Sequence, residues 1–225
     1  MDEKEALEKT WELWTGGRRA ELPALLEGDG DATAILRRYL ALQGQLYWKR
    51  SDLEAALAIS RFGLAYARKA GNREAENVLL FNVATFTLPW WYDSLPATSG
   101  QRDEGLEASQ RLLALRKDLG KGPADLSKVL WVLGAHHYVR GDPGRSVVHF
   151  NAAVVQARAA GDKGLEACAL EGLCRARIRL VPGERAWGLE TLSEAKALYE
   201  EAGDEYNRKE LEAFESRVAP AAPGE

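Results

Sequence analysis

The 225-residue sequence contains few residues that could make disulfides or metal sites, with two cysteines, one methionine and three histidines. Cys168 and Cys174 lie six residues apart on one expected helix, so they point to different faces and a disulfide between them is not expected. Two thiols without a companion pair make no zinc site, and free cysteines are generally buried, so we interpret both as small core residues. The low sulfur content is typical of a GC-rich or heat-adapted bacterial source.

Long hydrophobic runs and basic blocks are also missing. No stretch approaches the roughly 18 apolar residues that a membrane span needs. The net charge is −4, which argues against binding to nucleic acid or to an anionic membrane surface. The first residues, Met1-Asp2-Glu3-Lys4-Glu5, are charged where a signal peptide carries an apolar segment. We therefore expect a soluble cytoplasmic protein with no nucleic-acid partner and no membrane contact.

Motifs typical of catalysis are missing as well. The sequence has no glycine-rich phosphate loop, no nucleophile elbow and no His-Glu-x-x-His. His136 and His137 are adjacent and diverge by about 100° on a helix, and His149 follows after the next turn, so a metal site is not expected. Most carboxylates lie in mixed-sign runs typical of solvated helix faces. We expect no catalytic residues, no metal and no cofactor, and hence no enzymatic activity.

Four glycines occur at nearly even spacing along the chain, each after a segment with a helical hydrophobic period: Gly71, Gly120, Gly161 and Gly203. A glycine just past a helix supplies the left-handed residue that ends it, and the Asn or Asp that follows three of these glycines can cap the next helix. A period of this size built from helix pairs is typical of an α-solenoid.

The hydrophobic pattern predicts eleven helices and no strands. Short turns between most of them make consecutive helices antiparallel hairpins, and each hairpin leaves an apolar side for the next to cover. The predicted ranges are 3–15, 18–28, 32–49, 52–70, 73–91, 103–119, 124–140, 144–160, 163–180, 185–202 and 204–218.

Two of these hairpins carry the same residue types 90 positions apart. Each has a small residue where helices must approach closely, then an aromatic ring, a turn and another small residue. The pairs are Gly44 with Gly134, Tyr47 with His137, Ser51-Asp52 with Gly141-Asp142, and Ala56 with Ser146. Gly172 keeps the close-approach position in the pair 163–203. This pattern resembles the tetratricopeptide repeat (TPR).

The resemblance implies an all-α fold: a right-handed α-α superhelix, or TPR-like solenoid, of about five antiparallel hairpins plus a C-terminal capping helix. The expected organisation is a single domain over 1–218, with a degenerate N-terminal hairpin over 1–31, repeats over 32–203 and the capping helix over 204–218. The tail 219–225 is expected to be disordered. The family's motif residues are structural, so the match implies no catalysis.

The resemblance also implies a concave groove lined by the first helix of each hairpin. The aromatic, charged and polar residues that this register places there are Arg38, Gln45, Trp48, Lys49, Phe86, Lys128, Trp131, Tyr138 and Arg177. Trp, Tyr and Arg are common anchors at binding surfaces. The alternative is that a tightly wound superhelix, or the C-terminal helix, fills the groove and makes these rings part of the core.

A second candidate site is the aromatic run Trp90-Trp91-Tyr92, which follows Pro89. Proline kinks or ends a helix, so the three rings enter a loop of about ten residues. The run is either a lip that contacts a partner or a plug that fills the gap at the kink.

The leading interpretation is a non-enzymatic scaffold or adaptor that binds another protein or a peptide segment in its groove. The alternative is a regulatory or sensor module that binds a signal peptide or small ligand and acts on a separate effector. An uncapped stacking face, or the aromatic run, leaves homodimer formation open as well.

Overall fold

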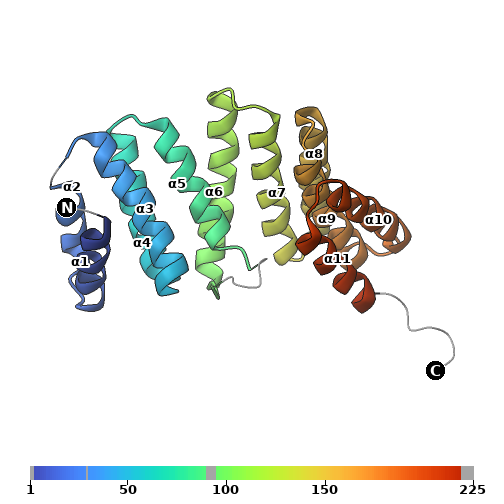
Figure 1. Cartoon of the computed structure of the whole chain (residues 1–225), viewed down its shortest axis with the longest axis horizontal. Helices are drawn as coiled ribbons and strands as arrows, with labels where there is room; N and C mark the ends of the chain where they lie inside the picture. The colour runs from blue at the N-terminus through green and yellow to red at the C-terminus, as the bar shows by residue number, and fades with distance from the viewer. Residues whose placement is uncertain (1–2, 29, 90–94, 219–225) are drawn as a thin grey trace. The chain divides into compact units, whose positions relative to one another are not determined.

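The computed structural model describes residues 3–28, 30–89 and 95–218, which form eleven α-helices and one short 3-10 helix (Figure 1). These described residues contain no β-strand, so the predicted all-α class is confirmed. Among them, no helix has the length and apolar character needed to cross a membrane. The chain divides into two compact units, Met1–Leu115 and Arg116–Glu225.

In the first unit, the helices from α1 to α5 pack in succession against their neighbours in the chain. α1 packs against α3, α3 against α4, and α4 against α5, while α3 also reaches α5. The elements are α1 (Glu3–Thr15), η1 (Arg19–Glu21), α2 (Leu22–Glu27), α3 (Ala32–Arg50), α4 (Leu53–Lys69), α5 (Arg73–Phe86) and most of α6 (Ser99–Asp118).

The second unit repeats this arrangement with hairpins whose two helices are nearly equal in length. α7 packs against α8, α8 against α9, α9 against α10 and α10 against α11, and α7 also reaches α9. The elements are α7 (Pro123–Val139), α8 (Pro143–Ala160), α9 (Lys163–Leu180), α10 (Arg185–Glu201) and α11 (Glu205–Val218).

The predicted helix ends are confirmed at the glycine turns. Gly71, Gly120, Gly161 and Gly203 all have positive φ angles, between 63° and 71°. After Gly71 and Gly161 the next helix begins on a side-chain cap, in which an Asp or Asn oxygen accepts a hydrogen bond from the N–H three residues on, whereas Gly122 before α7 makes no such bond. Caps of this kind lie at Asp31, Asp52, Asn72, Asp142 and Asp162.

Three predicted ranges were wrong at their ends. The helix expected over 73–91 stops at Phe86, because Pro89 lacks an N–H and disfavours helical backbone before it. The helix expected from 103 begins at Ser99, because Thr98 and Gln101 form a reciprocal capping box. The range 18–28 is a 3-10 turn followed by the short α2.

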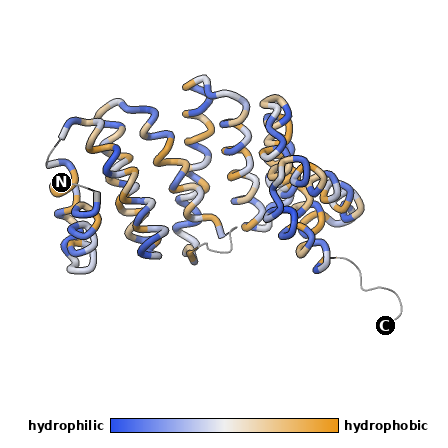
Figure 2. Tube along the Cα trace, viewed as in Figure 1, coloured by the Kyte–Doolittle hydropathy of each residue, from blue (hydrophilic) through white to orange (hydrophobic). Residues whose placement is uncertain are grey.

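The core lies on one face of each amphipathic helix, which Figure 2 shows as orange positions alternating with blue ones along the tube. In the second unit, Phe150 of α8 is fully buried where α7 and α9 pass closest to it. A Cβ added at Gly134 would lie 2.8 Å from this ring, and one added at Gly172 would lie 2.2 Å from it. The close approach predicted at both glycines is therefore confirmed.

The same prediction was wrong at Gly44 of α3. A Cβ added there would meet no heavy atom within 4 Å. The residue 90 positions before Phe150 is Ser60, which bonds to Gln43 and does not reach Gly44 with a ring. The first unit therefore has a glycine at the position that the pattern predicts, with no aromatic side chain packed against it.

Ser51 adopts a backbone conformation that a non-glycine residue rarely takes, with φ of 52° at the end of α3. The matching residue in the second unit is Gly141, whose φ is 70°. A left-handed backbone conformation costs an L-residue about 1–2 kcal/mol, a cost that glycine avoids. Glycine also loses more conformational entropy on folding, which offsets part of this gain. We expect Ser51→Gly to raise the free energy of unfolding by about 0.5–1 kcal/mol in urea titrations followed by circular dichroism. Ser51→Ala is the control, and an equal gain from alanine would contradict this explanation.

Candidate functional site

In the first unit, the predicted groove residues divide between solvent and core. Trp48 is 61% exposed and Lys49 is exposed as well. Arg38 and Gln45 are half-buried, and Arg38 donates a hydrogen bond to the Leu26 carbonyl. Phe86 is only 6% exposed and belongs to the core.

Trp48 stands on a platform of packed aromatic rings. The ring of Tyr47 stacks on Phe86, with centroids 4.2 Å apart, and Trp48 meets Tyr47 edge-on at 4.7 Å. The N–H of Leu95 donates to the Tyr47 hydroxyl at 3.3 Å, which ties the segment after the undescribed residues 90–94 to the platform. The exposed indole is thus held by buried neighbours.

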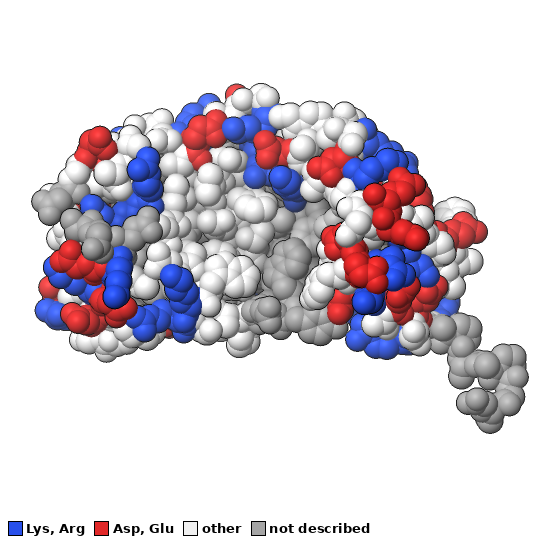
Figure 3. Space-filling view, in the orientation of Figure 1, with Lys and Arg blue, Asp and Glu red and all other residues white. Residues whose placement is uncertain are grey.

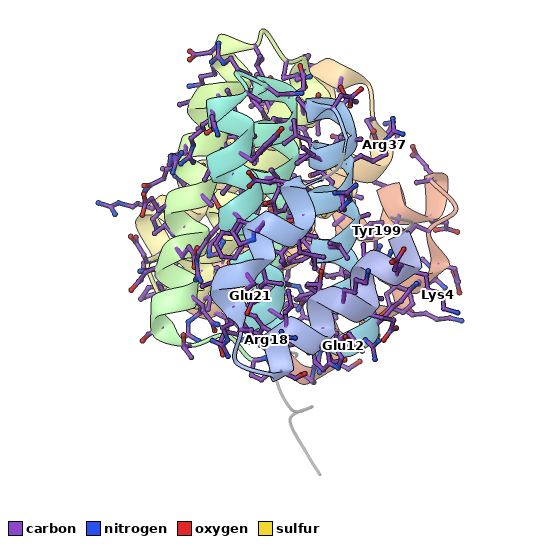
Figure 4. The ribbon with its side chains drawn as sticks, turned by 90° about the vertical axis from the view of Figure 1, so that its left-hand side faces the viewer. Lys4, Glu12, Arg18, Glu21, Arg37 and Tyr199 are labelled. Carbon is purple, nitrogen blue, oxygen red and sulfur yellow. The ribbon has the colours of Figure 1, made fainter. Side chains whose placement is uncertain are left out.

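Trp48 shares the outward face of α3 with Arg37, Ala41 and Gly44, because residues 3–4 apart recur on one side of a helix. Gly44 has open space where its Cβ would be. Arg37 is exposed, and in Figure 4 it projects away from the ribbon on the same side as Lys4 of α1. The middle of this face therefore carries small residues, with the cation of Arg37 at one end and the indole of Trp48 at the other.

α3 is also basic. It carries two arginines near its start, a lysine and an arginine in its last turn, and no carboxylate. Arg50 is neutralised by Glu8 at 2.7 Å, whereas Lys49 has no ion pair in the described parts of the chain. On the side drawn in Figure 3, Lys and Arg side chains border uncharged surface where α3 lies.

In the second unit, the central predicted groove residue belongs to the core. Trp131 is 7% exposed, its ring meets Phe150 edge-on at 6.4 Å, and its Nε1–H donates to the Cys168 carbonyl at 3.0 Å. Trp131 thus joins α7 to α9 as a packing residue.

The remaining predicted residues of this unit lie at its surface. Tyr138 is half-buried, and its hydroxyl accepts a hydrogen bond of 3.4 Å from Arg179. Arg177 donates to Thr191 at 3.1 Å and lies over the exposed ring of Trp187. Lys128 is exposed. Trp90, Trp91 and Tyr92 lie outside the described residues.

The histidines pair with each other. The rings of His137 and His149 stack with centroids 5.4 Å apart, and His137 Nδ1 lies 3.5 Å from a carboxylate oxygen of Asp142. Burial lowers the pKa of both imidazoles, which favours the neutral stacked pair. Within the described residues, no group of three or more His, Cys, Asp or Glu side chains is placed to hold a metal ion.

Cys174 is buried and Cys168 is half-buried. Burial raises the pKa of the Cys174 thiol to about 12 and shifts that of Cys168 in the same direction. Reactive cysteines have a lowered pKa, so these two thiols are suited to packing.

Sequence reasoning missed a repeated ion pair between the end of one hairpin and the start of the next. Arg68 Nε contacts Glu76 Oε1 at 2.8 Å, and Arg158 Nε contacts Glu166 Oε1 at 2.6 Å. Both arginines, and both glutamates, are 90 positions apart, which is the spacing of the predicted repeat. A search for charged residues at the repeat spacing would have found them.

Each of these two ion pairs contacts one further charged side chain, which is an arginine in the first unit and a glutamate in the second. In the first unit, Glu76 also accepts from Arg111 at 3.3 Å, so two guanidinium groups share one carboxylate oxygen. In the second unit, Arg158 also donates to Glu194 at 2.7 Å, so two carboxylates share one guanidinium.

A scan of protein-family models found no match to this chain, and a search of curated proteins found no similar sequence.

Proposed function

We propose that the chain is a TPR-like helical-repeat scaffold that binds a protein or peptide segment through the outward face of α3 and does no chemistry. Support for the repeat comes from the 90-residue correspondence, which now includes Arg68 with Arg158 and Glu76 with Glu166. The close packing of Phe150 against Gly134 and Gly172 supports it as well. A superhelix in a single cytoplasmic domain is part of this proposal.

The observation that carries the binding role is the exposed indole of Trp48. A tryptophan buried in an interface is among the most frequent binding hot spots, and its contribution is larger when its neighbours already hold it in place. Trp48 meets this condition, because Tyr47 and Phe86 fix it while its outer surface stays open. Lys49 and Arg37 add positive charge on either side.

The test compares two tryptophans of equal exposure. Peptides selected on the wild-type chain from a displayed random library would be titrated against Trp48→Ala and against Trp187→Ala. Trp187 is 59% exposed on α10 and serves as the matched control. We expect Trp48→Ala to weaken binding by about tenfold or more, because loss of an interface hot spot costs about 2 kcal/mol. Trp187→Ala should leave the affinity unchanged.

Circular dichroism would first establish that both variants keep the helical content of the wild type. Equal losses in the two variants would mean that any exposed tryptophan captures peptides, and the α3 face would then not be a specific site. Unchanged affinity of Trp48→Ala would overturn the proposal directly.

A further inference from the structure

A cavity of about 200 Å³ lies within the first unit, on α5 and between α4 and α6. Its floor is apolar and buried, made by Leu64, Leu80, Val83 and Ala108. Its mouth is charged and exposed, made by arginines and glutamates of α4 and α6. Pockets for drug-sized molecules have about 300–1,000 Å³, so this cavity suits a smaller ligand with an apolar body and a charged head.

One end of the mouth offers donors for a carboxylate. Arg68 and Arg111 both contact Glu76 Oε1, so two positive charges face one negative charge. Each guanidinium has five N–H donors, and each uses one of them on Glu76. The side chains are 42% and 44% exposed, so their remaining donors are accessible. Glu76 therefore holds both groups in place without neutralising them.

A carboxylate lies beside these donors on the same wall. Glu104, Glu107, Ala108 and Arg111 recur at helical spacing and so share the face of α6 that lines the cavity. Arg111 lies one turn after Glu107, the usual spacing of a helical ion pair, yet it reaches across to Glu76. Glu107 forms no ion pair within the described parts of the chain. It is thus available to an ammonium group.

The other end of the cavity is closed by a balanced pair. Arg61 donates to both carboxylate oxygens of Glu104, at 2.8 Å and 2.6 Å. Such two-point contacts are strong and well oriented, so neither side chain is free to bind a ligand. The charges open to a ligand are therefore positive at Arg68 and Arg111 and negative at Glu107, next to an apolar floor.

We propose that this cavity binds a free aliphatic α-amino acid of about the size of leucine. The ligand's carboxylate lies against Arg68 and Arg111, its ammonium group against Glu107, and its side chain on Leu64, Leu80 and Val83. This site lies on α4, α5 and α6 and is independent of the peptide surface on α3.

The test is calorimetric titration of the full chain with L-leucine and with two analogues that each lack one charge. 4-Methylpentanoate lacks the ammonium group, and 3-methylbutylamine lacks the carboxylate. We expect leucine to bind best, because each lost hydrogen bond to a charged group costs about tenfold in affinity. Absence of leucine binding, or tighter binding of the amine, would overturn the proposal.

Variants separate the two ends of the site. Arg111→Gln should weaken leucine binding by about tenfold. Glu107→Gln should weaken leucine by a similar factor and leave 4-methylpentanoate unchanged, a result that a general loss of structure would not produce. Arg158→Gln removes the corresponding ion pair of the second unit and should change nothing. Equal losses from Arg111→Gln and Arg158→Gln would contradict the assignment.

Discussion

Replacing Gly172 with alanine is expected to lower the free energy of unfolding of the second unit by about 2 kcal/mol. Alanine in place of glycine normally stabilises a helix by about 1 kcal/mol, so the direction of the effect is diagnostic. Here the new Cβ would lie 2.2 Å from the buried ring of Phe150, and overpacking of this kind costs about 1–3 kcal/mol or more. Urea unfolding followed by circular dichroism measures the change.

Gly44→Ala is the matched control, because it makes the same change in the corresponding helix where a Cβ meets nothing. We expect it to raise the free energy of unfolding by about 0.5–1 kcal/mol. Phe150→Leu combined with Gly172→Ala should cost less than the sum of the two single changes, because the smaller side chain makes room for the methyl group. Strict additivity would show that the ring is not the cause.

Replacing Glu171 with alanine is expected to lower the free energy of unfolding by about 3 kcal/mol. Glu171 Oε1 accepts from Arg175 at 2.8–2.9 Å, and Oε2 accepts from the hydroxyl of Tyr199 at 2.7 Å. Both carboxylate and hydroxyl are buried, so the group joins α9 to α10 away from water. Breaking a buried ion pair costs about 3–5 kcal/mol, and we expect the low end here because the Arg175 side chain is 17% exposed.

Tyr199→Phe tests the same group with a smaller change. It removes one hydrogen bond and keeps the ring, so we expect a loss of about 1 kcal/mol. Burial and the neighbouring carboxylate both raise the pKa of Tyr199, which therefore stays a hydrogen-bond donor at every physiological pH. If Glu171→Ala and Tyr199→Phe lower the free energy of unfolding equally, the contact between Arg175 and the Glu171 carboxylate does not stabilise the fold.

The helices were predictable because their signals are local. Glycine ends, Asp and Asn caps and the hydrophobic period act within a few residues, and they placed Gly161 and Asp162 correctly. The errors arose where a less familiar local signal competed, as at Thr98 and Gln101, whose capping box begins α6 four residues early.

The candidate site was less predictable, because exposure depends on what packs against a residue from elsewhere in the chain. Trp48 and Trp131 both belong to the groove face that the repeat register predicts, yet one is open and the other is held by Cys168 and Phe150. The cavity depends on the reach of Arg111 across to Glu76, which no spacing within α6 indicates.

The ring of Phe150 limits which side chains can replace Gly134 and Gly172. While it is present, neither Gly134 nor Gly172 can gain a side chain without a clash, so substitutions at the three sites should appear together in descendants. In the first unit, Ser60 lies 90 positions before Phe150, and a Cβ added at Gly44 would meet no heavy atom within 4 Å. Packing therefore does not require a glycine at position 44, and larger residues can be selected there for their effect on the face that carries Trp48.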